Sequence, residues 1–120
     1  MTLNTLTAIS PLDGRYFAST EVLGELFSEF GLQKQRLLVE IRWLECLGAE
    51  QGIPEIPPQS EHAKHFLQRL WEHFSEDEAK AIKNIEKTTN HDVKAVEYFL
   101  REKTADNPEL SVLGEFIHFA

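Results

Sequence analysis

The stretch SEHAKHFLQRLWEHFSEDE, residues 60–78, decides the fold class of this chain. Its apolar side chains recur at intervals of three and four residues, as on one face of a helix: Ala63, Phe66, Leu67, Leu70, Trp71 and Phe74. Ser60 precedes this run and is a suitable N-cap. Ser75 followed by Glu78 has the capping-box pattern, which marks the start of another helix. The stretch therefore predicts two consecutive helices.

The segment before this stretch predicts a longer helix over residues 32–49. One apolar stripe of that helix consists of Leu37, Ile41, Leu44 and Leu47, and a second stripe on the opposite side consists of Val39, Trp43 and Cys46. A helix that is apolar nearly all round is usually buried from several directions, so we expect Cys46 in the core. Residues 10–14 (SPLDG) and 52–58 (GIPEIPP) interrupt any helix and predict a tight turn and a loop.

In the segment after this stretch, the apolar residues also recur with the spacing of a helix. Residues 88–90 (TTN) interrupt the pattern, and a helix is expected from about His91 to Lys103. One face of that helix is apolar, and the other is expected to carry Lys94, Glu97, Tyr98 and Arg101. A further apolar stripe begins at Leu110 and runs to Ala120. Because no segment alternates like a strand, we predict an all-α fold and one small helical domain over residues 1–120.

Composition excludes several classes of function. The chain has 120 residues, with 20 acidic and 12 basic side chains and a formal net charge of −8. Without a cluster of Lys and Arg, a nucleic-acid-binding surface is not expected. Residues 1–9 do not resemble a secretory signal, and no run approaches the roughly 18 apolar residues of a membrane span. A single cysteine cannot form an internal disulfide, which favours a reducing compartment, so we expect a cytoplasmic location.

The end of the sequence favours a piece of a longer protein. Residues 116–120 (FIHFA) are mostly apolar, and no Gly, Asn or basic residue closes the expected helix. A natural, buried C-terminus is the alternative.

A metal site is not expected. His62 and His65 are three residues apart, which places them on one helical face, and two such histidines can bind zinc. Their spacing is not that of the HExxH motif, and no third ligand is positioned by the sequence. Exposed polar residues are the favoured interpretation of both histidines.

Two short segments could bind an anion. Asp13-Gly14-Arg15-Tyr16 places a guanidinium, whose planar donors fit phosphate or carboxylate, directly after a turn. The alternative is a surface arginine paired with a nearby acid. Residues 88–92 (TTNHD) lead into a helix whose N-terminal N–H groups favour an anion. The alternative there is simple capping by Asn90 or Asp92.

Four segments together resemble the adenylosuccinate lyase family of the fumarase/aspartase superfamily, in its bacterial form. They are residues 6–16 (LTAISPLDGRY), 42–44 (RWL), 85–100 (IEKTTNHDVKAVEYFL) and 115–120 (EFIHFA). The similarity runs through the whole chain but covers only about the N-terminal quarter of such an enzyme.

The resemblance implies a small all-α N-terminal domain and a role in substrate binding. Arg15 and Tyr16 match a pair that binds substrate near its phosphate, and Asn90, His91 and Asp92 match an element that lines the substrate site. His118 matches a histidine just before a Thr-Ser substrate-binding element. The family's central helical bundle, catalytic histidine and mobile-loop serine have no counterpart in this chain, so no catalytic residue is expected here. One side of the helix over residues 32–49 is then expected to face parts of the enzyme outside this chain.

The resemblance also implies the chemistry. The substrates would be adenylosuccinate and the succinyl-carboxamide ribotide of purine biosynthesis, cleaved by a homotetramer without a metal or organic cofactor. The chain alone would be inactive. Two alternatives remain: a stand-alone acidic α-helical interaction module, and a related lyase acting on argininosuccinate or fumarate.

Overall fold

A computed structural model describes residues 2–120, and all of their regular structure is helical. No strand occurs anywhere in that range, which confirms the all-α prediction. The chain divides into two compact units, with the boundary between Leu32 and Gln33. Each unit is described by itself, and a single domain over residues 1–120 stays a prediction.

The first unit has no apolar core within residues 2–32. It contains a loop followed by α1 (Phe17–Thr20), the 3₁₀ helix η1 (Glu21–Leu23) and α2 (Gly24–Phe27). Only two glycines of this unit, Gly14 and Gly31, are buried. Its large apolar side chains are exposed: Leu3, Leu6, Ile9, Leu12, Tyr16, Phe17, Val22, Leu23, Leu26, Phe27 and Leu32.

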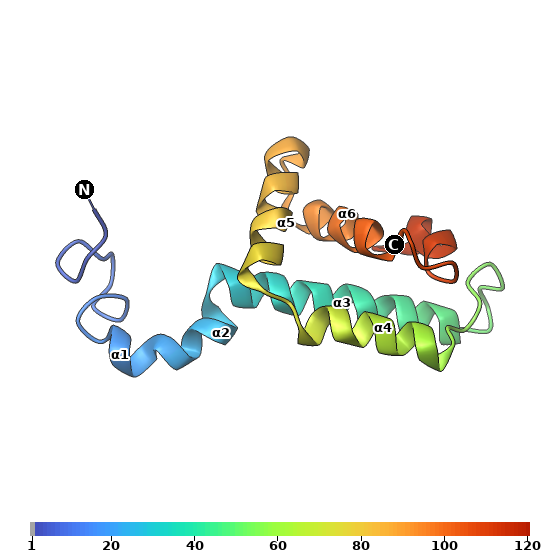
Figure 1. Ribbon diagram of the computed structural model, residues 1–120, viewed down its shortest axis with the longest axis horizontal. Helices are drawn as coiled ribbons and strands as arrows, with labels where there is room; N and C mark the ends of the chain where they lie inside the picture. Colours follow the sequence, from blue (N-terminus) through green and yellow to red (C-terminus); the bar gives the residue numbers. More distant parts are fainter. Residues whose placement is uncertain (1) are drawn as a thin grey trace. The chain divides into compact units, whose positions relative to one another are not determined.

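The second unit is built around α3 (Glu29–Ala49), which begins before the boundary. It is followed by α4 (Glu61–Glu72), α5 (Glu76–Thr89), α6 (Asp92–Thr104) and the 3₁₀ helix η2 (Ser111–Phe116). Helix α4 runs antiparallel beside α3 (Figure 1), where Arg42 Nη2 donates to Gln68 Oε1 at 2.6 Å. Helices α5 and α6 pack against each other.

The core of the second unit confirms the first predicted stripe of α3. All four of its residues, Leu37, Ile41, Leu44 and Leu47, are buried. They share the core with apolar side chains from every other helix of the unit and from the residues that flank those helices: Ala63, Leu67, Phe74, Ile82, Ala95, Val96, Phe99, Leu100, Leu110, Leu113 and Ile117. The rings of Phe74 and Phe99 meet edge to face, 6.1 Å apart.

The predicted helix starts are confirmed. Ser60 caps α4, because its hydroxyl accepts a hydrogen bond from the backbone N–H of Ala63 at 3.1 Å. Ser75 and Glu78 form a reciprocal capping box at the start of α5. Both contacts satisfy N–H groups that a helix leaves without partners in its first turn.

The expectation of Cys46 in the core was wrong, whereas contact of the second stripe of α3 with parts of a longer enzyme stays a prediction. Val39, Trp43 and Cys46 of the second stripe are exposed, and so Cys46 is not a core residue. The physical reason is that the described residues bury α3 along the stripe of Leu37 and leave the opposite side exposed. On that side Trp43 Nε1 donates to the Phe119 carbonyl at 2.7 Å, but the side chains of Val39, Trp43 and Cys46 remain exposed.

Two further expectations need correction. Glu97, expected on the polar face of α6, is buried, and ion pairs to Lys94 at 3.0 Å and Arg101 at 3.6 Å compensate its charge. The expected last helix is a 3₁₀ helix that ends at Phe116 instead of continuing to Ala120.

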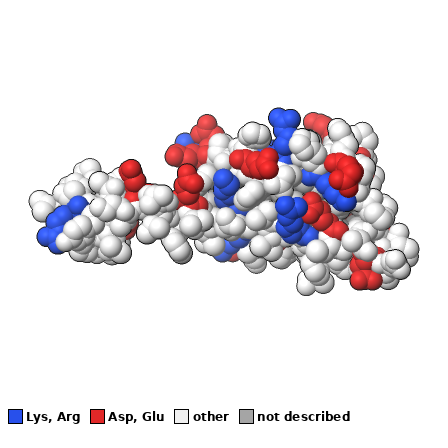
Figure 2. Space-filling view, turned by 90° about the horizontal axis from the view of Figure 1, so that it is seen from below, with Lys and Arg blue, Asp and Glu red and all other residues white. Residues whose placement is uncertain are grey.

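The surface carries charges of both signs. On the face seen in Figure 2, acidic and basic side chains of the second unit are interspersed. Among residues 2–120, no helix is both long and apolar enough to cross a membrane.

Candidate functional site

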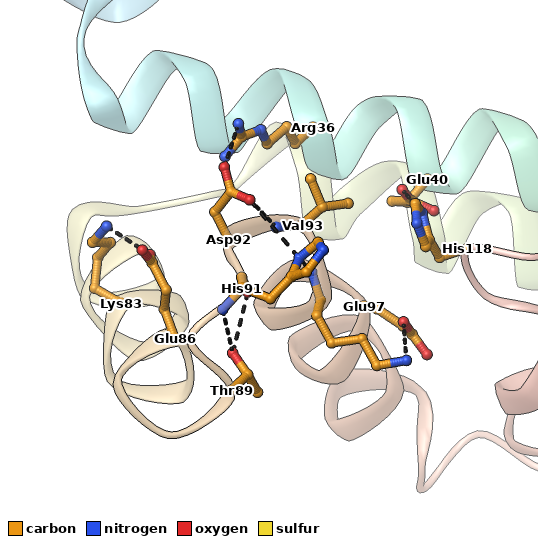
Figure 3. Close-up of polar contacts among 11 residues, drawn as sticks. Arg36, Glu40, Lys83, Glu86, Thr89, His91, Asp92, Val93, Glu97 and His118 are labelled. Carbon is orange, nitrogen blue, oxygen red and sulfur yellow. Dashed lines mark hydrogen bonds and ion pairs between the residues drawn. The ribbon is translucent and has the colours of Figure 1, made fainter.

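The junction between α5 and α6 consists of Asn90, which ends α5, His91, and Asp92, which begins α6. Figure 3 shows the side chains of His91 and Asp92 at this junction. Asn90 ends α5 in the left-handed conformation, with φ of 51°, and its N–H donates to the Glu86 carbonyl at 2.8 Å. Asparagine tolerates this conformation better than most residues, which explains its place at the break. The backbone then turns so that α6 starts at Asp92.

His91 is the N-cap of α6, so the alternative of capping by Asn90 or Asp92 named the wrong residue. Its backbone is extended, and its Nδ1 accepts a hydrogen bond from the N–H of Lys94 at 3.1 Å. A ring nitrogen that accepts carries no proton, so in the neutral ring the hydrogen is on Nε2. The side chain is 61% exposed. His91 therefore has an Nε2–H group available as a donor.

The Asp92 carboxylate accepts a hydrogen bond in the first turn of α6 and connects this turn to α3. One carboxylate oxygen accepts from the N–H of Val93 at 2.9 Å, and the other lies 2.7 Å from Arg36 Nη2. The hydrogen bond from Val93 and the charge of Arg36 lower the pKa of Asp92 below its ordinary value. Asp92 is thus an anion that helps to position the helix start.

These contacts change how the helix start could bind a ligand. The N–H groups of Val93 and Lys94 are already used by the side chains of Asp92 and His91. An anion at this place would therefore contact the His91 ring and the Asn90 amide rather than those two backbone donors. Asn90 also borders a shallow hollow with Lys83, Glu86 and Lys87, in which Lys83 pairs with Glu86 at 2.6 Å.

Arg15 and Tyr16 lie together in the first unit. A tight turn precedes them, with the N–H of Gly14 donating to the Pro11 carbonyl at 3.3 Å. A Cβ on Gly14 would lie 2.9 Å from the Thr5 carbonyl oxygen, so the turn requires glycine. The Arg15 guanidinium lies 4.7 Å from the centre of the Tyr16 ring.

Both side chains of this pair are exposed. Arg15 forms no ion pair with any residue of 2–120, so the alternative of a surface arginine paired with an acid is not seen in this range. Its guanidinium retains donors for a phosphate or carboxylate.

The histidines considered for zinc remain on the surface of α4. His62 and His65 are exposed, and no group of three metal-ligating side chains forms within residues 2–120.

Sequence reasoning missed Glu40 and Arg36. Glu40 Oε1 lies 2.7 Å from His118 Nδ1, and Arg36 pairs with Asp92. A signal for Glu40 was present, because it lies three residues after Leu37 and four before Leu44, at a core-facing position of α3. A charged residue at such a position indicates a buried contact.

Comparison with known proteins shows what the whole chain is similar to. No family model matches the chain. Proteins named adenylosuccinate lyase are similar to it over all 120 residues, with 57% identity for that of Vibrio cholerae, 55% for Haemophilus influenzae and 53% for Escherichia coli K12. The chain is homologous to adenylosuccinate lyases. It spans about a quarter of the length of these relatives, 26% in each case.

This homology confirms the resemblance to adenylosuccinate lyase that was inferred from the four sequence segments. It includes both segments that hold the candidate residues, Arg15–Tyr16 and Asn90–Asp92. The binding roles of Arg15, Tyr16, Asn90, His91 and Asp92 stay predictions.

Proposed function

We propose that this chain is the N-terminal part of an adenylosuccinate lyase. The assembled enzyme cleaves adenylosuccinate to AMP and fumarate, and the succinyl-carboxamide ribotide to its carboxamide and fumarate. The observation that carries the proposal is identity of more than half of all residues with proteins of that name, along the entire chain.

The reaction is a β-elimination. A base removes a proton from the carbon next to a carboxylate of the succinyl group, and the electron pair left there forms the double bond of fumarate as the C–N bond breaks. A general acid protonates the departing nitrogen, which becomes the amino group of AMP or the carboxamide nitrogen of the other product. Hydrogen bonds and positive charge stabilise the carbanion, so no metal or organic cofactor is needed. We place the base and the acid outside this chain.

The residues of this chain bind and orient the substrate. Arg15 offers planar donors beside the Tyr16 ring, and these fit the substrate phosphate. His91 offers its Nε2–H, with the ring orientation fixed by the hydrogen bond from Lys94. Asn90 adds an amide at the same junction. Asp92 keeps that junction in place through Arg36 rather than binding an anion itself.

The exposed apolar surface supports a role as part of a larger assembly. Single exposed apolar residues are ordinary, but contiguous apolar surface indicates an interaction site. The first unit exposes nearly all of its large apolar side chains, and α3 exposes Val39 and Trp43. We propose that the remainder of the enzyme and neighbouring subunits of a cytoplasmic homotetramer cover these surfaces.

A chimera tests the proposal. The corresponding quarter of the E. coli enzyme is replaced by this chain, and conversion of adenylosuccinate to AMP is followed by ultraviolet absorbance. We expect an active chimera, and no turnover by the 120-residue chain alone. An Arg15→Ala chimera is the matched variant, with kcat/KM expected to fall roughly ten- to a hundred-fold.

The opposite result has a clear meaning. A chimera that folds and forms the same oligomer as the E. coli enzyme but has no activity would contradict the proposal. It would favour the alternative of an acidic helical interaction module.

A further inference from the structure

A buried carboxylate and a half-exposed imidazole meet in the second unit. The Glu40 side chain is 7% exposed, and its Oε1 lies 2.7 Å from Nδ1 of His118, which is 47% exposed (Figure 3). The other carboxylate oxygen, Oε2, is also buried and has no hydrogen-bond partner. A carboxylate in such a place is destabilising unless a nearby cation compensates its charge. Packing alone therefore gives no reason for an acid at this position.

The segment that carries His118 is held in place by side chains from two helices. The indole Nε1 of Trp43 donates to the Phe119 carbonyl at 2.7 Å, and Nε of Arg101 donates to the Gly114 carbonyl at 2.8 Å. His118 itself adopts φ of 57°, in the left-handed region that residues other than glycine rarely occupy. Backbone in this region persists where surrounding contacts hold it, and such positions cluster at functional sites.

The contact with Glu40 determines which ring nitrogen of His118 is available. An ionised carboxylate only accepts hydrogen bonds, so Nδ1 must carry the proton that it donates to Glu40. Nε2 then remains for an external partner, since no residue of 2–120 bonds to it. If the ring is protonated at both nitrogens, it also supplies the positive charge that the buried carboxylate requires.

We propose that Glu40 is a positioning residue for His118. Its carboxylate accepts the hydrogen bond from Nδ1, keeps the proton there and presents Nε2 to the substrate. A carboxylate that orients an imidazole in this way is a common arrangement where a histidine binds or transfers a proton. The inference rests on the proposed function, because it assumes that the ligand of Nε2 is the lyase substrate.

The first test is a double-mutant cycle in the full-length protein that contains this chain. Glu40→Gln keeps the shape of the side chain and removes its charge, and we expect a ten- to a hundred-fold lower kcat/KM. His118→Ala should lower kcat/KM at least as much. Because Glu40 acts through His118, the double variant should lie within about two-fold of His118→Ala. Losses that multiply, or unchanged kcat/KM in Glu40→Gln, would overturn the proposal.

The second test reads the ring directly by nuclear magnetic resonance of the ¹⁵N-histidine-labelled chain. We expect the neutral His118 ring to carry its proton on Nδ1, with the Nε2 signal of an unprotonated nitrogen. A proton on Nε2 in the unmodified chain would overturn the proposal, whether or not any variant folds. Glu40→Gln should shift both nitrogen signals.

Glu97→Gln is the matched control, because Glu97 is equally buried but pairs with Lys94 and Arg101. It should leave the His118 nitrogen signals unchanged. The two tests also separate the two proposals. An inactive full-length protein whose His118 proton is on Nδ1 would contradict the lyase function and retain the role of Glu40.

Discussion

Two substitutions of His91 should separate its structural role from its role in binding. Nδ1 caps α6 through the N–H of Lys94, whereas Nε2–H is exposed as a donor. His91→Ala removes both groups. His91→Asn removes the ring but provides a side-chain oxygen that is among the best N-caps. The two variants should therefore agree in activity and differ in stability.

The size of each effect follows from the geometry. The cap bond is 3.1 Å long and its side chain is largely exposed, which places the loss in His91→Ala at about 1 kcal/mol. A loss of that size lowers the melting temperature of a domain as small as the second unit by roughly 4–8 °C. His91→Asn should stay within about 0.5 kcal/mol of the original. In both variants, a lost charge-assisted contact to the substrate should reduce kcat/KM roughly ten- to a hundred-fold.

Circular dichroism melting of the chain measures the first effect, and steady-state kinetics of the active chimera measures the second. If His91→Asn retains full kcat/KM, the ring does not contact the substrate. If His91→Ala melts at the original temperature, the cap contributes nothing to stability. Either result would refute the corresponding half of the reasoning.

Three further outcomes are expected. Leu44→Ala should lower the unfolding free energy of the chain by about 2–5 kcal/mol, and Val39→Ala by no more than about 0.5 kcal/mol, because only Leu44 is buried. Denaturant titration measures both losses, and equal losses would contradict the described core. Hydrogen bonds from the Ser60 hydroxyl and N–H lower the pKa of Glu109 below its ordinary value of 4.5. These bonds therefore stabilise the fold above pH 4.5, and the stabilisation is lost as the pH falls from 4.5 through the lowered pKa of the folded state. Denaturation midpoints between pH 7 and 3 should fall less in Glu109→Gln, and identical slopes would argue against this contact. Arg15→Lys keeps the charge but loses the planar fork, so KM of the chimera should rise about ten-fold, and an unchanged KM would show that charge alone suffices.

Local patterns predicted the parts of the fold that depend on neighbouring residues. The caps at Ser60 and Ser75 involve groups three residues away, and the apolar stripes follow from helical spacing. The exposed side of α3 could not be predicted in this way, because a stripe of Val39 and Trp43 shows only that a surface is apolar. Whether this side of α3 is covered depends on segments far away in sequence.

The candidate site was predictable to a similar extent. The motif around His91 indicated a helix start and an anion-binding histidine, but not that the ring itself would cap the helix. Histidine is a less common cap than asparagine or aspartate, so propensity favoured the neighbours Asn90 and Asp92. The left-handed conformation of Asn90 decided the matter, since a residue that closes one helix in this way leaves the next residue to open the following helix.

Glu40 and Glu97 show where local reasoning stops. Each occupies a core-facing helical position and is buried. Glu40 has Leu37 three residues before it and Leu44 four after it, whereas Glu97 has Val93 four residues before it and Leu100 three after it. The partners of Glu97, Lys94 and Arg101, lie one turn away on the same helix, so its compensation is readable from spacing. The partner of Glu40 is 78 residues further along the chain. Spacing alone would pair Glu40 with Arg36, four residues earlier on α3, but Arg36 pairs with Asp92 instead. A basic residue one turn away is therefore not enough to identify the partner of a buried acid, because a distant group can take up that base, and here the partner of Glu40 is a histidine with one ring nitrogen still available.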